Sequence, residues 1–232
     1  MSSDSRAPSV LFDVDGTLVD SNYLHVTAWL RAFDAEGVPV DGWRIHRCIG
    51  MDGTTLVRTL SGDAGQDVLD RLKDLHSEFY QETTSLLAPL PGARDLLRWV
   101  AGHGLQVVLA TSAPEDELAT LREILDCEDA ISAVTSSEDV DTAKPKPDIV
   151  QIALERAGVG AQDAVFLGDA VWDCEAAKRA GVPSIGVQSG GVSPAELREA
   201  GATAVFEDPG DLLANVDSTL LGELARRVSD PR

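Results

Sequence analysis

The chain has 232 residues, a hydrophobic content of 44% and a formal net charge of −20, which indicate a globular protein with a sizeable core. A strongly negative field repels nucleic acid and anionic membranes, so we expect neither as a partner. The three cysteines form no CxxC or Cys/His cluster, which argues against a zinc site or a disulfide framework. The N-terminal MSSDSRAPS lacks the apolar stretch of a signal peptide and no apolar run could span a membrane, so we expect a cytoplasmic protein.

Short apolar runs rich in β-branched residues predict strands along most of the chain. The strongest candidates are residues 9–14, 105–111, 164–169 and 183–187, and the weaker ones are 130–136 and 203–206. Because the strong runs are apolar on both faces, they are typical of parallel strands covered by helices on both sides. Helical patterns that often begin at proline and end at glycine lie between them. The sequence therefore predicts an α/β fold with a doubly wound, Rossmann-like parallel sheet.

The segment between the first and second strong strands breaks this alternation. From about Asp20 to Ala88 no strand-like run occurs, and a structureless loop of that length is implausible. Helical spacing of apolar residues instead predicts helices over 21–36, about 53–60, and 65–82. We therefore predict two domains, a core of residues 1–20 and 88–232 and an inserted helical domain of residues 21–87.

Two aspartates lie at the carboxyl end of the first predicted strand, at a spacing that brings their side chains together. Side chains two residues apart on a strand share a face, and Asp13 and Asp15 lie at the strand end where open α/β sheets bind ligands. Two close carboxylates repel unless a cation or a shared proton separates them, and Mg²⁺ prefers such oxygen ligands. Taken alone, the pattern is more typical of an exposed acidic loop after a strand, and it is the other segments that favour a cation site.

Hydroxyl and ammonium groups occupy two other predicted strand ends or the loops after them. Thr111 and Ser112 precede a helix, where hydroxyls and free backbone N–H groups can bind an anion, although Ser112 could simply cap the helix. In TAKPKPD each proline restrains the residue before it, so we expect Lys144 to hold its ammonium at a fixed point. Lys146 is expected to face solvent, and a solvated loop lysine is the alternative for Lys144.

A second acidic pair ends the third strong strand. Asp169 follows Gly168 at the strand end, and Asp173 lies four residues later near a helix start, where it could also be a helix cap. Since all these groups lie at the carboxyl ends of strands, the fold should bring them to one crevice. In such a crevice the carboxylates could hold a metal ion, and the cations and hydroxyls could hold an anion. This combination favours phosphoryl transfer.

These four segments resemble the four motifs of the haloacid dehalogenase superfamily. DVDGT, the Thr111–Ser112 strand end, Lys144 in KPKPD and GDAVWD match them in order and at suitable separations. The resemblance covers nearly the whole chain, includes a helical cap inserted after the first motif, and is greatest to the phosphoglycolate phosphatase and β-phosphoglucomutase-like branch. It implies an Mg²⁺-dependent phosphatase that acts on a small phosphate ester.

The resemblance also implies a role for each motif residue. Asp13 would be the nucleophile that forms an aspartyl-phosphate, and Asp15 would give a proton to the leaving group and take one from water. The carboxylates of Asp13 and Asp169 and the main-chain carbonyl of Asp15 would bind Mg²⁺. The full set of expected residues is Asp13, Asp15, Thr111 and Lys144 for catalysis, Ser112 for substrate binding, and Asp13, Asp15, Asp169 and Asp173 for the metal.

Other branches of the superfamily fit less well. Dehalogenases carry tyrosine where this chain has Asp15, and the Schiff-base lysine of phosphonoacetaldehyde hydrolases has no clear counterpart, because Lys73 lies on a helix typical of solvated lysines. A β-phosphoglucomutase-like mutase stays an alternative, although mutases carry Glu-Asp where this chain has Gly168–Asp169. A phospho-acceptor signalling domain is a third possibility, but its acceptor lies on a later strand and it has no inserted cap.

The substrate's leaving group is the part of the site for which the sequence is least informative. The resemblance implies that cap residues contact it, and the candidates are Arg47, Gly53, Thr54 and His25. A surface cation is the alternative for Arg47, and a hinge residue is the alternative for His25. We expect a monomer or a weak homodimer.

Overall fold

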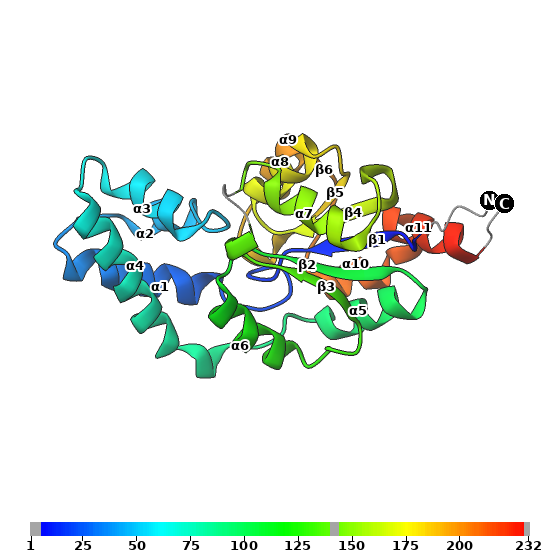
Figure 1. Ribbon diagram of the computed structural model, residues 1–232, viewed down its shortest axis with the longest axis horizontal. Coiled ribbons are helices and arrows are strands. Elements are labelled where there is room, and N and C mark those ends of the chain that lie inside the picture. The colour runs from blue at the N-terminus through cyan, green and yellow to red at the C-terminus, as the bar shows by residue number, and fades with distance from the viewer. Residues whose placement is uncertain (1–5, 140–143, 230–232) are drawn as a thin grey trace.

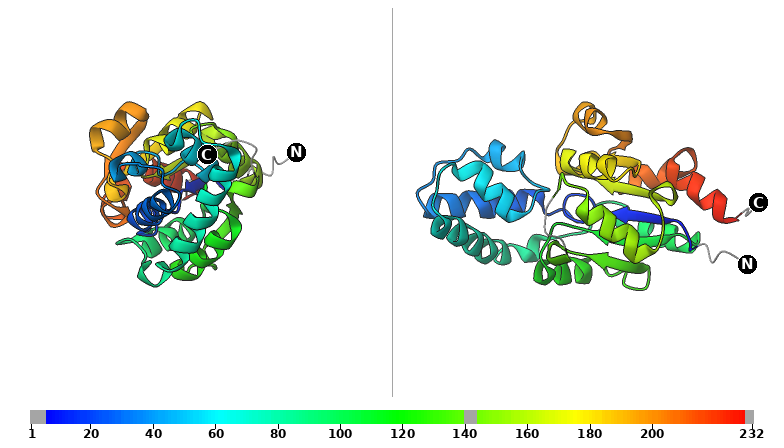
Figure 2. Two further views of the ribbon diagram at one scale, coloured as in Figure 1. Left: turned by 90° about the vertical axis from the view of Figure 1, so that its left-hand side faces the viewer. Right: turned by 45° about the horizontal axis from the view of Figure 1, so that its top comes forward.

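The computed structural model describes residues 6–139 and 144–229, and it has two parts that lie side by side (Figure 1). One part contains the sheet and the helices that flank it. The other contains four helices, and the right-hand view of Figure 2 shows this part beyond one end of the sheet. Within the described ranges, every helix is too short or too polar to cross a lipid bilayer.

The sheet has six parallel strands in the order β3-β2-β1-β4-β5-β6. The strands are β1 (Ser9–Phe12), β2 (Gln106–Ala110), β3 (Ile131–Thr135), β4 (Ala164–Gly168), β5 (Ser184–Val187) and β6 (Ala202–Phe206). In β1 the register pairs Phe12 with Leu109 of β2 and with Leu167 of β4. All six predicted strands, including the two weaker ones, are present, and the predicted α/β class with a parallel sheet is confirmed.

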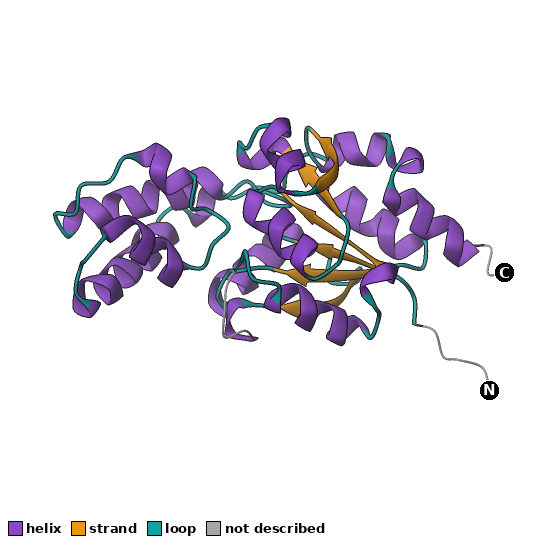
Figure 3. Cartoon of the chain, turned by 90° about the horizontal axis from the view of Figure 1, so that it is seen from above, coloured by secondary structure: helices purple, strands orange, loops and turns teal. Residues whose placement is uncertain are grey.

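Helices cover both faces of this sheet, as the view from above shows (Figure 3). Successive side chains of a strand point to opposite faces, so Val10 and Phe12 pack into one apolar cluster and Leu11 into another. The first cluster is completed by α5 (Ala93–Gly102), α6 (Glu115–Leu125), α10 (Pro209–Ala214) and α11 (Leu220–Ser229). The second is completed by α7 (Asp148–Ala157) and α8 (Val171–Arg179), while α9 (Pro194–Ala200) packs near β6. Burying a leucine or phenylalanine side chain in such clusters stabilises the fold by about 1.5–3 kcal/mol.

The four helices beyond the sheet have an apolar cluster of their own. They are α1 (Asn22–Ala35), α2 (Gly42–His46), α3 (Gly53–Ser61) and α4 (Gln66–Gln81). Trp29 and Phe33 of α1 pack there with Leu56 of α3 and Leu72 of α4. The three helices expected in this segment are present.

The chain crosses between the two parts twice, and the two crossings are hydrogen-bonded to each other. The Asp20 N–H donates to the Ala88 carbonyl at 2.9 Å, and the Leu90 N–H donates to the Leu18 carbonyl at 2.9 Å. Val19 and Pro89 form an antiparallel bridge between these bonds. The helical part is therefore held to the sheet by a short two-stranded connection.

Three helices were not expected from the sequence. Helix α2 has only five residues, too few for a periodic pattern. Helix α10 has six residues, and α11 contains Gly222, which is unfavourable inside a helix. Gly222 is required by close packing, because a Cβ there would lie 2.5 Å from the Val216 carbonyl oxygen.

Candidate active site

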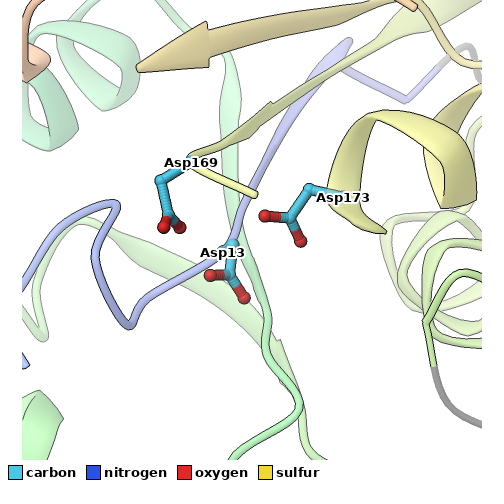
Figure 4. A group of neighbouring side chains, drawn as sticks. All are labelled: Asp13, Asp169 and Asp173. Carbon is cyan, nitrogen blue, oxygen red and sulfur yellow. The ribbon is translucent and has the colours of Figure 1, made fainter. Parts of the chain in front are cut away.

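Three buried carboxylates meet at the carboxyl ends of the central strands. Asp13 follows β1, Asp169 follows β4, and Asp173 lies in the first turn of α8. One ligand oxygen from each lies within 4.8 Å of the others, and Figure 4 shows the three side chains turned toward a common point. Neighbouring strands end side by side, so the sheet itself brings together residues that are 156 positions apart, from 13 to 169.

Lys144 lies against this acidic cluster. Its side chain is fully buried, and its Nζ is 2.6 Å from Oδ1 of Asp13 and 2.8 Å from Oδ1 of Asp173. The opposing charges of these two carboxylates raise the pKa of Lys144, although burial alone would lower it. Lys146 is exposed, as expected. The lysine is therefore charged and fixed.

Hydrogen bonds fix the other two carboxylates of the cluster. Oδ1 of Asp169 accepts from the Thr17 hydroxyl at 2.8 Å, and Oδ2 accepts from Nδ2 of Asn22 at 2.8 Å. Oδ2 of Asp173 accepts from the Ala170 backbone N–H at 3.0 Å. Asp173 thus satisfies the start of α8, as the cap alternative predicts, and it also pairs with Lys144.

Burial and mutual repulsion both act on the carboxylates of the cluster. Burial, followed by the charge of Asp173, raises the pKa of Asp169 to about 7, and the hydrogen bonds from Thr17 and Asn22 and the charge of Lys144 counteract the rise only in part. Burial also raises the pKa of Asp13 well above its ordinary value, against the attraction of Lys144. A nearby cation would oppose both increases, because it favours the ionised carboxylates.

The donor set fits a hard divalent cation. When all three carboxylates are ionised they carry three negative charges and Lys144 one positive charge, so two negative charges are left for a divalent ion to balance. All three ligand groups are oxygen donors, which Mg²⁺ prefers.

Asp15 turns away from this cluster toward the start of α1. Its Oδ1 accepts from the Ser21 hydroxyl at 2.6 Å and lies 3.3 Å from Nε2 of His25. Ser21 and His25 are four residues apart, so one helical turn brings both to the same carboxylate. Burial alone would raise the pKa of Asp15, but the hydrogen bonds and charge of His25, with Ser21 and Lys144, lower it.

The ring of His25 is part of a stack of aromatic rings. Nδ1 of His25 lies 3.1 Å from Nε2 of His76 on α4, and the ring of His25 stacks on Tyr80 with centroids 3.9 Å apart. His76 in turn stacks on Trp29. Burial would lower the pKa of His25, but the hydrogen bond and charge of Asp15 and the charge of Glu117 raise it. Burial and the charge of His25 hold the pKa of His76 well below its usual range.

A cleft of about 900 Å³ opens over Asp13 between the sheet and the helices α1, α3 and α4. Of the residues expected to contact substrate, it is lined by His25, Gly53, Thr54, Thr111 and Ser112. Asp15 and Lys144 also line it.

Arg47 is placed differently from the other substrate candidates. It does not line the cleft, and its Nη2 lies 2.7 Å from Oε1 of Glu196 on α9. Its backbone carbonyl accepts from Nε1 of Trp172 at 3.2 Å. Nε2 of the neighbouring His46 lies 2.8 Å from the Gly190 carbonyl oxygen. Arg47 therefore joins α2 to the sheet part of the molecule.

The hydroxyl pair after β2 has one local and one distant contact. Oγ1 of Thr111 accepts from the Ala113 N–H at 3.0 Å, and Oγ of Ser112 donates to the Gly50 carbonyl at 3.4 Å. The residue before α6 is Pro114, so Ser112 is not the helix cap.

Several residues that shape the site were not singled out from the sequence as site residues. They are Thr17, Ser21, Asn22, His76, Tyr80 and Glu117. The spacing of Ser21 and His25 could have shown that both reach one carboxylate. His76 is 51 residues from His25 and only packing brings them together.

The sequence model of the haloacid dehalogenase-like hydrolases matches residues 10–187 of this chain. That range begins in β1 and ends with β5, and it includes every residue of the acidic cluster and Lys144. The chain belongs to the haloacid dehalogenase-like hydrolase family. The resemblance noted in the motifs is confirmed, and so is the prediction that the protein is an enzyme.

Relatives and solved structures agree with this assignment. A phosphoglycolate phosphatase of Pseudomonas putida is 32% identical over 188 residues, which cover 78% of this chain and 69% of the relative. A phosphorylated carbohydrates phosphatase of Thermotoga maritima is 31% identical, with 86% and 94% covered. The crystal structure of a hydrolase from Pseudomonas syringae superposes with a TM-score of 0.87 at 37% identity, covering 91% of this chain and 98% of that one. A β-phosphoglucomutase from Clostridium difficile shares the fold, with a TM-score of 0.81 at 18% identity and 95% and 98% covered.

Proposed function

We propose that this member of the family is a phosphatase that hydrolyses small phosphate monoesters with Mg²⁺, through an aspartyl-phosphate on Asp13. The observation that carries the proposal is the position of Asp13, which lines the cleft while Lys144 holds its Oδ1 at 2.6 Å. A carboxylate held at one oxygen presents the other to a phosphorus atom in a fixed direction.

Each neighbouring group has a role in this proposal. An oxygen of Asp13 attacks phosphorus, and the bond between phosphorus and the leaving oxygen breaks. Asp15 gives a proton to that oxygen and takes one from the water that later cleaves the aspartyl-phosphate. Lys144, Thr111 and the backbone after Thr111 stabilise the charge on the transferred group, and Ser112 contacts it.

Asp13, Asp169 and Asp173, with the main-chain carbonyl of Asp15, would hold Mg²⁺. When bound, the ion neutralises charge on the phosphoryl group and on the carboxylates. Thr17 and Asn22 keep Asp169 directed toward that position through their hydrogen bonds.

We also propose that residues 21–87 form a cap domain over a core of residues 1–20 and 88–232. Cap residues His25, Gly53 and Thr54 face the cleft and would contact the leaving group. Arg47 has a supporting role in the closed arrangement through Glu196. A closed cap excludes bulk water and leaves room for one positioned molecule.

Phosphoglycolate and sugar phosphates are the substrates to test first, because relatives named for both kinds of phosphatase match this chain. A sugar phosphomutase is the second candidate, supported by the shared fold with a β-phosphoglucomutase. Gly168 at the position where mutases carry glutamate favours hydrolysis. Phosphate release measured beside isomerised sugar phosphate distinguishes the two reactions.

The test of the nucleophile is the substitution Asp13→Asn, assayed as phosphate released from p-nitrophenyl phosphate with Mg²⁺. We expect the wild-type protein to turn over and to yield an acid-stable phosphoprotein on quenching, and the variant to lose at least about 10³-fold in kcat with no phosphoprotein. Asp208→Asn is the matched control, because Asp208 caps α10 without lining the cleft and asparagine caps equally well. Turnover that survives in Asp13→Asn would refute the assignment.

A further inference from the structure

Asn22 is the first residue of α1, yet its side chain points into the acidic cluster. It is 2% exposed, and its Nδ2 donates to Oδ2 of Asp169 at 2.8 Å. The other oxygen of Asp169 accepts from Thr17, which belongs to the loop after β1. One carboxylate of the cluster is thus held by one donor from the sheet part and one donor from the helical part.

Two glycines leave the space that the contact between Asn22 and Asp169 requires. A Cβ on Gly16 would lie 2.3 Å from Nδ2 of Asn22, and a Cβ on Gly190 would lie 1.7 Å from Oδ2 of Asp169. Ser189 closes the same region, because its hydroxyl donates to the Gly16 carbonyl at 2.6 Å. Asn22 and Asp169 therefore have little freedom to separate without moving these loops.

The second polar atom of Asn22 is buried and has no partner. Its Oδ1 accepts no hydrogen bond from any residue in the described part of the chain. A buried amide oxygen without a donor is costly, by about 1–3 kcal/mol, unless a donor reaches it. Water held by a cation at the acidic cluster is a donor of the required kind.

We propose that Asn22 is a positioning residue that couples the cap to the metal site. Its Nδ2 orients Asp169, and its Oδ1 accepts from a water molecule on the bound cation. Because Asn22 begins α1, a cation that tightens these contacts also holds the first turn of α1 against the sheet. The inference rests on the proposed function, since it requires that the cluster bind Mg²⁺.

This coupling is reciprocal. If Mg²⁺ favours the docked position of α1, then docking of α1 favours Mg²⁺ by the same free energy. Loss of Asn22 should therefore weaken the cation and free the helix, whereas loss of Thr17 should weaken the cation alone, because Thr17 lies on the sheet side.

The experiment measures Mg²⁺ affinity by calorimetry and amide hydrogen exchange in the first turns of α1, with and without Mg²⁺, on full-length protein without substrate. We expect Asn22→Ser to bind Mg²⁺ roughly 10- to 100-fold more weakly, the range found for residues that orient metal ligands. In the wild-type protein Mg²⁺ should slow exchange in α1, and in Asn22→Ser it should not. Thr17→Val, which keeps the shape of the side chain, should weaken Mg²⁺ but retain the slowing.

Asn215→Ser is the matched control, because Nδ2 of Asn215 also donates to a carboxylate, Oδ1 of Asp211 at 3.0 Å, at an exposed position. It should leave both readouts unchanged. Asn22→Ala, also smaller than asparagine, serves if the serine variant does not fold. An unchanged Mg²⁺ affinity in either Asn22 variant would overturn the inference, as would Mg²⁺-dependent slowing that persists in α1. A wild-type protein that binds no Mg²⁺ would instead overturn the metal site of the proposed function, and the inference with it.

Discussion

Lys144 brings a positive charge to the buried end of the sheet, where its side chain has no exposure to solvent. The carboxylates of Asp13 and Asp173 neutralise this positive charge, and Lys144 in turn offsets part of their negative charge. Removing one partner of a buried ion pair leaves charges that neither water nor protein can neutralise. The lysine is therefore as important for holding the acidic cluster together as for the chemistry proposed there.

We expect Lys144→Ala to lower the free energy of unfolding of the metal-free protein by roughly 3–5 kcal/mol. Its kcat should fall at least about 100-fold, because a cation that stabilises the transferred phosphoryl group is lost. Urea unfolding and phosphate release check the two effects. Lys146→Ala is the control, since Lys146 is two residues away, exposed, and also lines the cleft. Equal effects of the two substitutions would contradict the role given to Lys144.

Glu117 is a second residue whose charge depends on its surroundings. It lies in the first turn of α6 and lines the cleft, and burial raises its pKa to about 7, with a further rise from Asp15 that His25 opposes. The unfolded chain releases this proton near the ordinary pKa of 4.5. The folded protein therefore binds one more proton than the unfolded chain between these values, and its stability falls as the pH rises through that window.

The substitution Glu117→Gln should remove this loss. The measured quantity is the unfolding free energy of the variant minus that of the wild-type protein. This difference should be more favourable to the variant at pH 8.5 than at pH 4.5, on the order of 1–3 kcal/mol. Urea unfolding at the two pH values measures it. Glu115→Gln, an exposed change on the same helix, should show no such dependence. A gain for Glu117→Gln that is the same at both pH values would contradict the raised pKa of this half-buried carboxyl.

At the scale of elements, the loop between α2 and α3 is where the helical part contacts the sheet part beside the cleft. Gly50 has a φ of +94°, its carbonyl accepts from Ser112, and a Cβ on it would lie 2.9 Å from the Cβ of Ala170. Trp172 lies 3.3 Å from the same point. The absence of a side chain at Gly50 is thus a condition for the close approach of the two parts.

We expect Gly50→Ala to move this loop away from α8 and to reduce kcat/KM about tenfold, because a small displacement of a closing element disturbs the geometry of reaction. Gly37→Ala is the control. Gly37 also has a positive φ of +67°, but a Cβ there meets nothing within 4 Å, so it should show only the backbone strain of about 1–2 kcal/mol. Steady-state kinetics and thermal unfolding separate the two effects. Matching kinetics for both variants would show that the contact with Ala170 does not matter.

At the scale of the whole molecule, the features that could be predicted are those that follow from the repeated alternation of strands and helices along the sequence. The six strands could be identified because each is an apolar run between helical patterns. Motif residues at the strand ends, such as Asp13 and Asp169, meet because parallel strands end along one edge. Lys144 lies in the segment between β3 and α7 and reaches the same edge, although 131 positions separate it from Asp13.

The residues that were missed depend on contacts between elements that have no common pattern. In the sequence Asn22 has the features of an ordinary first residue of a helix, and only the structure shows its contact with Asp169. His76 has those of any polar residue on an amphipathic helix. Arg47 was considered for substrate, but α2 turns it toward Glu196. No periodicity in the sequence encodes the direction in which α2 faces.

The hydrogen-bonded pair of crossings at Asp20 and Ala88 has a consequence for how such a chain can diversify. The two ends of the inserted segment are already in contact, with the Asp20 N–H 2.9 Å from the Ala88 carbonyl oxygen. The entropy of closing a loop rises only slowly with its length, so the sheet is nearly indifferent to how much polypeptide lies between these two points. A segment of another length in place of helices α1–α4 should accordingly leave the sheet intact, because the junction at Asp20 and Ala88 would still close the connection.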